Sequence, residues 1–390
     1  MADREHLNIL FLMENFLPHI GGTRIYYHHL LKTLPCKITV ITRQHPESEV
    51  FDATQDFDII RIPFGENKFL RPFRLQELSK YRAMFSAARR EIKRQDFDFI
   101  LCDLPAICGT VAWVLRFFYR VPFGVFSHDE AFQSNRRLIP KLEKLVLNAA
   151  DFIGCSSDYA RNKLISGNVA GDKITTIFPG LDKDQFIQSS AEALRREWQL
   201  EGRKILLTVA RLETHKGQDR VIRAMVKVID KHPDAIYLIG GKGSAEEGLR
   251  ELVSKLGLDN HVRFLGYVAG DKANECLMLA DLVLLLSCPG PGGKILEGFG
   301  IANIEASALG KPVITGNIGG TDQSVIDGET GFRVDPDNED ELTMRIMQLL
   351  DDQALAQTIG ERGRKFVMEK FRAEDKASEL HQLLLKLKSQ

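Results

Sequence analysis

Short apolar runs alternate with helical segments along almost the whole chain, and this alternation limits the possible folds more than any other feature. The first run, residues 8–13 (NILFLM), is almost continuously apolar, as expected of a strand that is buried on both faces of a parallel sheet. Similar runs follow at residues 37–42 and 58–63, and a second series begins at residues 204–211 (KILLTVAR). The pattern predicts an α/β fold with two doubly wound, Rossmann-like domains.

The length of 390 residues also suits two domains. We predict an N-terminal domain over residues 1–180, a second domain over residues 181–370 and a helical segment over residues 371–390. Ligands of doubly wound sheets bind at the carboxyl ends of the strands. Two such domains would therefore hold their ligands in a central cleft between them.

The composition excludes several classes of protein. The net charge of −1 and the pI of about 6.8 carry no nucleic-acid-binding signature, so we expect no nucleic-acid partner. The six cysteines show neither a CxxC pair nor a metal-ligand spacing, which is typical of buried free thiols in a reducing compartment. No apolar run reaches the roughly 18–20 residues of a membrane span, and the polar start of the chain does not resemble a signal peptide. We therefore predict a cytoplasmic protein.

Residues 294–315 hold the densest set of candidate site residues. Glu297 and Glu305 lie eight positions apart with a Gly-Phe-Gly turn between them, and the turn predicts a helix from about residue 301 to residue 309. The N-terminus of such a helix offers free N–H groups and the positive end of a dipole, which suit a phosphate. The layout suggests a sugar nucleotide, with its diphosphate at the helix end and a carboxylate for the hydroxyls on each side.

A pair of cations and a pair of glycines follow predicted strands. Arg211 and Lys216 end one strand and lead into the next helix, where they are either a diphosphate site or two solvated charges. Gly21 and Gly22 follow the first strand, where they allow either close approach to a ligand or an ordinary turn. The chain has no G-x-G-x-x-G sequence at this point, so we reject a dinucleotide site.

Two further strand ends carry weaker signals. His128 ends the run FGVFSH at the edge where ligands bind, so either a functional or a structural histidine fits. Asp129 and Glu130 follow it and belong either to the site or to the solvated surface. Gly241 lies in a glycine cluster after another strand, which either admits a ligand or forms a tight turn.

Four Asp-x-Asp triplets could in principle hold a divalent cation, but their contexts favour turns and connecting loops. The triplets are Asp56/Asp58, Asp96/Asp98, Asp182/Asp184 and Asp335/Asp337. We predict no metal site and no cofactor, so cationic side chains and backbone N–H groups would have to neutralise a diphosphate.

Residues 68–94 carry nine basic and two acidic residues. Within this segment the pattern of residues 75–94 predicts a helix with an apolar stripe. The stripe consists of Leu75, Leu78, Tyr81, Phe85, Ala88 and Ile92. The segment is either a core-packed helix with a solvated basic face or a contact with anionic lipid or a phosphorylated acceptor.

Several motifs in order resemble the GT4 family of retaining glycosyltransferases, which have the GT-B fold. The motifs are GGTRIYYHHL, FSHDE, VARLETHKG, VRFLGYV and, as the most specific, the Glu-x7-Glu segment EGFGIANIEA. At the domain junction FPGLD keeps only the Gly and Asp of the family's Pro-Asn-Gly-Val-Asp, and Thr23-Arg24 makes an unusual glycine loop. These departures concern acceptor binding or the domain hinge.

The resemblance implies roles for the matched residues. Arg211 and Lys216 would hold the donor diphosphate, Glu297 and His128 would face the transferred sugar, and Glu305 would contact the ribose. The implied catalytic residues are His128, Arg211, Lys216 and Glu297. The implied donor-binding residues are Gly21, Gly22, Gly241, Val268, Gly298, Phe299, Gly300, Ile301 and Glu305. The final helix, residues 373–387, would cross back onto the N-terminal domain.

From the resemblance we predict a retaining, metal-independent hexosyltransferase that uses a UDP- or GDP-sugar and an acceptor hydroxyl on a lipid or glycan. The mechanism would be front-face displacement. Two alternatives stay open: an epimerase or phosphorylase on the same fold, and a non-catalytic sugar-nucleotide-binding subunit. Peripheral contact with an anionic membrane at its inner face would use residues 68–94.

Overall fold

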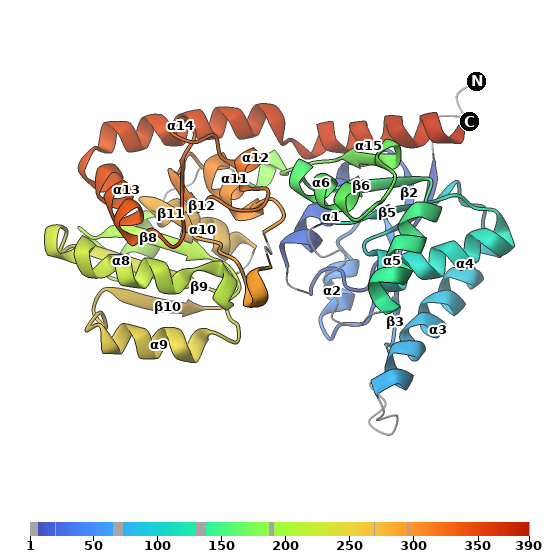
Figure 1. Ribbon diagram of the computed structural model, residues 1–390, viewed down its shortest axis with the longest axis horizontal. Coiled ribbons are helices and arrows are strands. Elements are labelled where there is room, and N and C mark those ends of the chain that lie inside the picture. The colour runs from blue at the N-terminus through green and yellow to red at the C-terminus, as the bar shows by residue number, and fades with distance from the viewer. Residues whose placement is uncertain are drawn as a thin grey trace. The chain divides into compact units, whose positions relative to one another are not determined.

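The computed structural model describes residues 7–19, 21–64, 73–128, 138–186, 191–268, 270–294 and 297–389, except the side chains of 73–77, 138, 184 and 291. The chain forms two compact units (Figure 1). Unit 1 comprises Met1–Gly180 with Ala373–Gln390, and unit 2 comprises Leu181–Arg372. Each unit is built on one parallel sheet, as the alternation of apolar runs and helices predicts.

The sheet of unit 1 has seven parallel strands in the order β3-β2-β1-β4-β5-β6-β7. The strands are β1 (Asn8–Leu12), β2 (Lys37–Arg43), β3 (Asp58–Ile62), β4 (Phe99–Cys102), β5 (Phe123–Phe126), β6 (Phe152–Cys155) and β7 (Ile174–Thr176). The chain starts in the middle of the sheet, builds outward to β3 and then crosses to β4 on the other side of β1. The strand order therefore reverses between β1 and β4, and ligands of doubly wound sheets bind at such a point.

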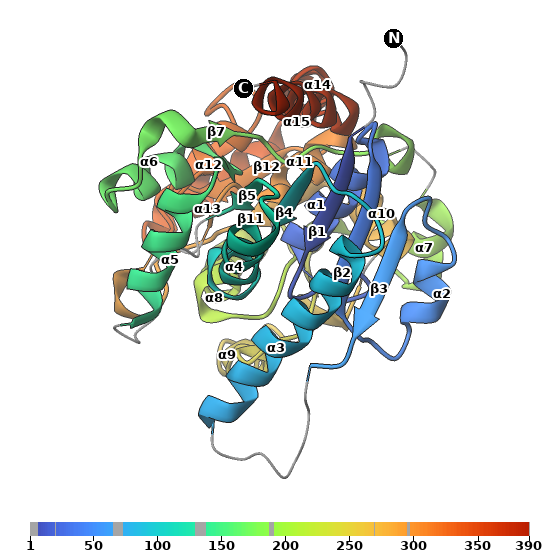
Figure 2. The ribbon, with the colours of Figure 1, turned by 90° about the vertical axis from the view of Figure 1, so that its right-hand side faces the viewer.

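Helices cover both faces of this sheet. They are α1 (Gly22–Thr33), α2 (Ser48–Asp52), α3 (Phe73–Ile92), the π-helix η2 (Pro105–Gly109), α4 (Thr110–Tyr119), α5 (Leu138–Ala149), α6 (Asp158–Ser166), η3 (Gly171–Lys173) and α15 (Ala373–Lys388). Apolar residues of α3, α4, α5 and α6 form one continuous core with the strands. Figure 2 shows α3, α4 and α5 side by side on this face.

The final helix α15 packs against α1 (Figure 1). The hydroxyl of Thr33 on α1 donates a hydrogen bond to the carbonyl of Ala373 (3.2 Å). At the other end of α15, Lys388 forms an ion pair with Asp98 (2.6 Å). The predicted return of the C-terminal helix to the N-terminal domain is therefore confirmed.

The sheet of unit 2 has six parallel strands in the order β10-β9-β8-β11-β12-β13. The strands are β8 (Lys204–Val209), β9 (Ala235–Gly240), β10 (Val262–Gly266), β11 (Leu282–Leu285), β12 (Val313–Gly316) and β13 (Phe332–Val334). Here the order reverses between β8 and β11, so the loops after these two strands lie at the position where a ligand is expected.

The helices of unit 2 connect these strands. They are η4 (Lys183–Gln185), α7 (Glu192–Glu197), η5 (Thr214–Lys216), α8 (Gln218–Lys231), α9 (Glu246–Lys255), α10 (Asp271–Leu279), η6 (Pro291–Gly293), α11 (Ile301–Ala308), α12 (Thr321–Ser324), α13 (Glu339–Asp351) and α14 (Gln353–Lys370). The predicted helix after the Gly-Phe-Gly turn is α11, and it begins where the sequence indicates.

The predicted apolar stripe of α3 is partly wrong. Leu78 is 62% exposed, whereas Met84, which the stripe omits, is fully buried together with Ala88. Tyr81, Phe85, Ala88 and Ile92 of the stripe do pack on the core, so Leu78 is the one described member that the prediction placed wrongly. The side chain of Leu75 lies outside the described residues. The predicted buried thiols are confirmed, since five of the six free cysteines are buried and Cys36 is half-buried.

Candidate active site

The centre of the site in unit 2 is a buried ion pair between Lys216 and Glu297. The ammonium of Lys216 lies 2.8 Å from Oε2 of Glu297, and their side chains are 15% and 9% exposed. Lys216 ends the short helix after β8, and Glu297 follows β11, so the strand-order reversal brings the two together. The hydroxyl of Ser287 donates a second hydrogen bond to the same oxygen of Glu297 (2.8 Å).

These partners keep Glu297 ionised. Burial alone would raise the pKa of its carboxyl, but the charge and hydrogen bond of Lys216 lower it below its usual value, as do the hydroxyl of Ser287 and the N–H of Gly300. The ammonium of Lys216 has three donor positions. Since Glu297 takes one of them, two remain for phosphate oxygens.

The N-terminus of α11 lies directly after this pair. Gly300 precedes the helix with a φ of 86°, a left-handed backbone that favours glycine, and a Cβ there would lie 2.6 Å from Nδ2 of Asn303. No acidic side chain and no side-chain cap occupies the first turn. Within the described residues the N–H groups of Ile301 and Ala302 have no hydrogen-bond acceptor, so they are open to an anion.

Glu305 lies one turn further along α11 and behaves differently from Glu297. It is half-buried, and no charged or polar partner contacts its carboxyl within the described part of the chain. Burial therefore raises its pKa to about 7. The carboxyl is ready to accept hydrogen bonds from ligand hydroxyls but is not yet paired.

Arg211 lies in the same loop as Lys216. Its side chain is exposed, and its guanidinium has no ion-pair or hydrogen-bond partner among the residues that the structure describes. Its carbonyl accepts a hydrogen bond from Nε2 of Gln218 (3.0 Å), which fixes the loop. Next to it, burial lowers the pKa of His215, and the charges of Lys216 and Arg211 lower it further. Both cations therefore act on one small region, as a diphosphate site requires.

Gly241 and Val268 lie at the ends of neighbouring strands of unit 2. A Cβ on Gly241 would lie 1.9 Å from the carbonyl oxygen of Ala210, so backbone packing by itself requires glycine at this turn. The side chain of Val268 lies over Gly240 at the end of β9. Phe299 is buried against Phe371, with ring centroids 5.3 Å apart, and this contact anchors the Gly-Phe-Gly turn. Gly298 is half-buried.

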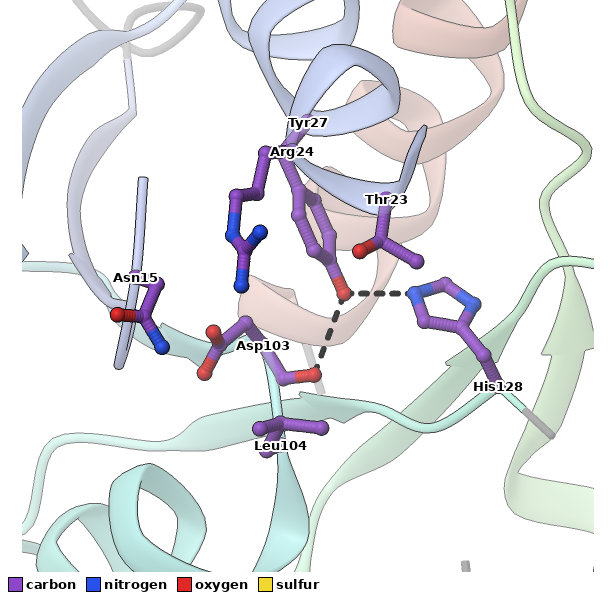
Figure 3. A pocket seen from close by; sticks show the side chains of 7 residues that line it. All are labelled: Asn15, Thr23, Arg24, Tyr27, Asp103, Leu104 and His128. Carbon is purple, nitrogen blue, oxygen red and sulfur yellow. Dashed lines mark hydrogen bonds between the residues drawn. The ribbon is translucent and has the colours of Figure 1, made fainter. Parts of the chain in front are cut away.

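The site residues of unit 1 gather around His128 (Figure 3). His128 follows β5 and is buried, and its Nε2 lies 2.8 Å from the hydroxyl of Tyr27 on α1. That hydroxyl donates to the carbonyl of Asp103 (3.3 Å). A tyrosine hydroxyl has one proton, so when it donates to Asp103, Nε2 of His128 is the donor to the hydroxyl and Nδ1 is an acceptor. Nδ1 is buried and has no partner within the described residues.

Burial lowers the pKa of His128 to about 4, so the ring is neutral at physiological pH. A small hollow opens between α1 and the ends of β4 and β5. It is lined by Asn15, Thr23, Arg24, Tyr27, Asp103, Leu104 and His128. Its lining is mostly polar, includes the charged Arg24 and Asp103, and suits a ligand rich in hydroxyl groups.

The glycines of unit 1 lie beside this hollow. Gly21 has a φ of 156°, and a Cβ there would lie 2.6 Å from Nη1 of Arg24. Gly22 begins α1 and is exposed. The predicted site residues thus form two groups, one in each unit. That they face one cleft stays a prediction, and Asp129 and Glu130 lie outside the described residues.

Sequence reasoning missed Tyr27 and Ser287, which hold two of the predicted site residues in place. Tyr27 stands in the quoted motif GGTRIYYHHL, but nothing in the sequence links it to His128, 101 positions away. Ser287 ends the apolar run LVLLLS, and a polar residue at the end of a buried strand was the available signal.

Two of the four Asp-x-Asp triplets have side chains with structural partners. Asp98 accepts a hydrogen bond from the N–H of Asn8 (2.8 Å), and Asp337 pairs with Arg220 (2.7 Å). In the described part of the chain no three His, Cys, Asp or Glu side chains are grouped as metal ligands would be.

Two family models match consecutive parts of the chain. The model described as Glycosyltransferase Family 4 matches residues 20–185, and the model described as Glycosyl transferases group 1 matches residues 190–366. Together they cover both units. The chain belongs to the GT4-like glycosyltransferases.

Curated relatives of this GT4-like protein include mannosyltransferases. A GDP-mannose-dependent alpha-(1-6)-phosphatidylinositol monomannoside mannosyltransferase of Mycolicibacterium smegmatis is 32% identical over 240 residues, 61% of this chain and 63% of the relative. The match thus spans less than two thirds of that relative. A GDP-mannose-dependent monoacylated alpha-(1-6)-phosphatidylinositol monomannoside mannosyltransferase of Corynebacterium glutamicum is 28% identical over 366 residues, 92% of each chain.

Solved structures of glycosyltransferases share the fold of this GT4-like chain. HepE of Anabaena, solved in complex with UDP-glucose, has a TM-score of 0.82 at 20% identity and covers 97% of this chain and 99% of its own. Sucrose-phosphate synthase of Thermosynechococcus elongatus has a TM-score of 0.81 at 22% identity and covers 98% of this chain and 100% of its own. At these identities the likeness confirms the fold, two Rossmann-like α/β domains of the GT-B class.

Proposed function

We propose that this protein is a retaining, metal-independent glycosyltransferase that moves a hexose-type unit from a nucleotide-sugar to an acceptor hydroxyl on a lipid or glycan. The observation that carries the proposal is the buried Lys216–Glu297 pair beside the open N-terminus of α11. A glycosyl donor releases a nucleoside diphosphate, so the site must stabilise the negative charge that develops on the leaving oxygen. Lys216, Arg211 and the N–H groups of α11 supply that stabilisation.

The proposed reaction is a front-face displacement. The acceptor oxygen bonds to the anomeric carbon as the bond from that carbon to the phosphate oxygen breaks, and the departing phosphate oxygen takes the acceptor proton. Attack and departure on one face retain the anomeric configuration. Glu297, held ionised by Lys216, accepts hydrogen bonds from hydroxyls of the transferred sugar.

The other predicted residues would bind the donor. Glu305 accepts from the ribose hydroxyls, and Val268 lies near the base. In unit 1 the neutral His128 offers Nδ1 to a sugar hydroxyl, and Gly21 and Gly22 approach the diphosphate. Each of these roles adds a contact to the transferred sugar or to its leaving group and requires no cofactor.

For the donor we propose GDP-mannose, because the relatives from Mycolicibacterium and Corynebacterium are named for GDP-mannose and for phosphatidylinositol mannosides. Their names also favour a phosphatidylinositol-based lipid as the acceptor. The protein would then act in the cytoplasm, at the inner face of the membrane, which carries such lipids. UDP-sugars are the second candidate donors.

A thermal-shift series with GDP, UDP, ADP and their sugar conjugates tests this proposal, because a ligand of the folded state raises Tm according to its concentration over Kd. We expect a shift with GDP and GDP-mannose that EDTA does not change. NMR of the product made with phosphatidylinositol mannoside should show the α-anomer. A shift that requires a divalent cation, or an inverted product, would contradict the proposal.

Product analysis with and without acceptor and free phosphate separates the alternatives. An epimerase converts the donor without an acceptor, and a phosphorylase requires free phosphate. A non-catalytic subunit would bind the donor tightly and turn over with none of the acceptors.

A further inference from the structure

Helix α4 carries apolar residues beyond the face that packs on the sheet. Val111, Ala112 and Leu115 are buried in the core. Phe117, which the helical period places on the far side, and Phe118, at the edge of the buried face, are 82% and 65% exposed. A surface helix normally carries polar residues on its outer face. The outer face of α4 instead exposes two large aromatic side chains.

The exposed apolar surface extends beyond the two phenylalanines. Trp113 and Val114 lie one turn earlier on α4 and are 36% and 38% exposed, and Leu145 on the adjoining α5 is 58% exposed. The rings of Phe117 and Phe118 are in contact, with centroids 5.3 Å apart. We call these five residues the α4 patch. Helices α3, α4 and α5 lie next to one another in Figure 2. A group of exposed large apolar side chains of this kind marks an interaction site.

The charges around the α4 patch have one sign. Within α4, α5 from residue 139 onward and residues 85–92 of α3, every exposed charged side chain is basic, and the two acidic ones, Glu91 and Glu143, are buried. The exposed basic residues are Arg89 and Arg90 on α3, Arg120 directly after α4, and Lys141 on α5. Arg89 also donates a hydrogen bond to the hydroxyl of Tyr119 (3.0 Å), which ties the basic end of α3 to α4.

We propose that the α4 patch is a peripheral membrane-binding surface for a bilayer rich in anionic lipid. Exposed Trp and Phe beside Lys and Arg are the combination that inserts into the boundary between headgroups and acyl chains. Each basic residue near an anionic leaflet adds to the electrostatic attraction. Among the described helices none is long and apolar enough to cross a bilayer, so the contact is a surface contact.

A second copy of the chain fits this surface less well. A twofold contact places the same patch on both partners, so the basic residues of one copy would face those of the other. An anionic surface instead meets them with the opposite charge. The predicted basic segment, residues 68–94, contributes Arg89 and Arg90 to this surface. Its residues 68–72 lie outside the described residues. The side chains that would insert into the bilayer belong to α4 and α5. The proposal does not rest on the donor chemistry.

Sedimentation with phosphatidylglycerol–phosphatidylcholine vesicles tests the proposal with the full chain. We expect the wild type to bind these vesicles and to bind pure phosphatidylcholine weakly. Phe117→Ser with Phe118→Ser should lower the partition coefficient roughly tenfold or more, since two large apolar side chains no longer insert. Both sites are exposed, so folding is preserved. Val50→Ser, at a 78% exposed apolar residue of α2 in the same unit, is the matched control and should bind normally.

Charge and insertion are measured separately. Arg90→Glu with Lys141→Glu should weaken binding to the anionic vesicles and reduce its dependence on salt. In a Trp198→Phe background Trp113 is the remaining tryptophan, since the chain has two, and its emission should shift to the blue on binding. Vesicle binding that survives the phenylalanine substitutions overturns the proposal. So does a wild type that ignores vesicles but forms a dimer that these substitutions dissociate.

Discussion

The two units solve the problem of a buried polar site in opposite ways. In unit 2 the buried groups are ionic, and Lys216 and Glu297 neutralise each other at 2.8 Å. In unit 1 the central pair is neutral, and Tyr27 holds His128 through a hydrogen bond of the same length. A diphosphate brings permanent charge to its site, whereas sugar hydroxyls bring none. The difference supports the proposal that the cations of unit 2 hold the diphosphate and that His128 of unit 1 meets a sugar hydroxyl.

The pKa values follow this division. Lys216 lowers the pKa of Glu297 in spite of burial, so that carboxylate is charged before any ligand binds. Among the described residues no cation faces His128, and burial lowers its pKa to about 4. Glu305 is the exception in unit 2, since burial raises its pKa to about 7 and no described residue pairs with its carboxyl. Substitutions at these residues and their partners test this difference between the two units.

The largest effect is expected at the ionic site. Lys216→Ala should lower turnover by roughly a hundredfold, the scale of one lost donor to a developing negative charge, and should weaken nucleotide diphosphate binding. Single-turnover kinetics with GDP-mannose measures the chemical step. Lys255→Ala, at an exposed lysine on α9 of the same unit, is the control and should be unchanged. Unchanged turnover in Lys216→Ala would remove the ion pair from the mechanism.

A smaller effect is expected from the titration of Glu305. If only its carboxylate accepts from the ribose, a pKa of about 7 makes nucleotide affinity rise roughly tenfold from pH 6 to pH 8. Isothermal titration with GDP at both pH values measures the change. Glu305→Gln should abolish the pH dependence, while His128, already neutral, should contribute none. A slope that persists in Glu305→Gln belongs to another group.

The neutral site should respond more weakly. Tyr27→Phe removes one hydrogen bond from His128, so we expect roughly fivefold lower kcat/KM, on the scale of about 1 kcal/mol for such a bond. GDP affinity should not change, because the proposed nucleotide site lies in unit 2. The matched control is Tyr26→Phe, which removes an equally buried hydrogen bond to the carbonyl of Ile177 (3.2 Å). If both variants lose activity alike, the effect is one of packing and not of positioning.

The smallest effect concerns stability without ligand, and it has opposite signs at the two glutamates. The raised pKa of Glu305 means that its ionisation destabilises the fold as pH rises from 4.5 toward about 7, so Glu305→Gln should raise Tm at pH 8 but not at pH 4. The lowered pKa of Glu297 stabilises the fold above 4.5 and is lost on acidification, so Glu297→Gln should lower Tm at pH 8 and less so at pH 4. Calorimetry at both pH values measures the difference, and equal signs would contradict the pairing.

The two parallel sheets, the start of α11 and the final helix could all be predicted from the sequence. These depend on local rules: continuous apolar runs form buried strands, and the turn Gly298–Phe299–Gly300 needs the left-handed backbone that precedes α11. The types of the main site residues could also be read directly, because strand ends and helix N-termini are where such folds bind ligands.

Only the tertiary structure decided which side chains meet. Tyr27 reaches His128 because α1 packs against the end of β5, and Ser287 reaches Glu297 because both follow β11. The burial of each apolar side chain also depends on the fold, which leaves Leu78 on α3 and Phe117 on α4 exposed. Periodicity gives the position of an apolar residue along a helix, but burial depends on which neighbours the fold brings to that face.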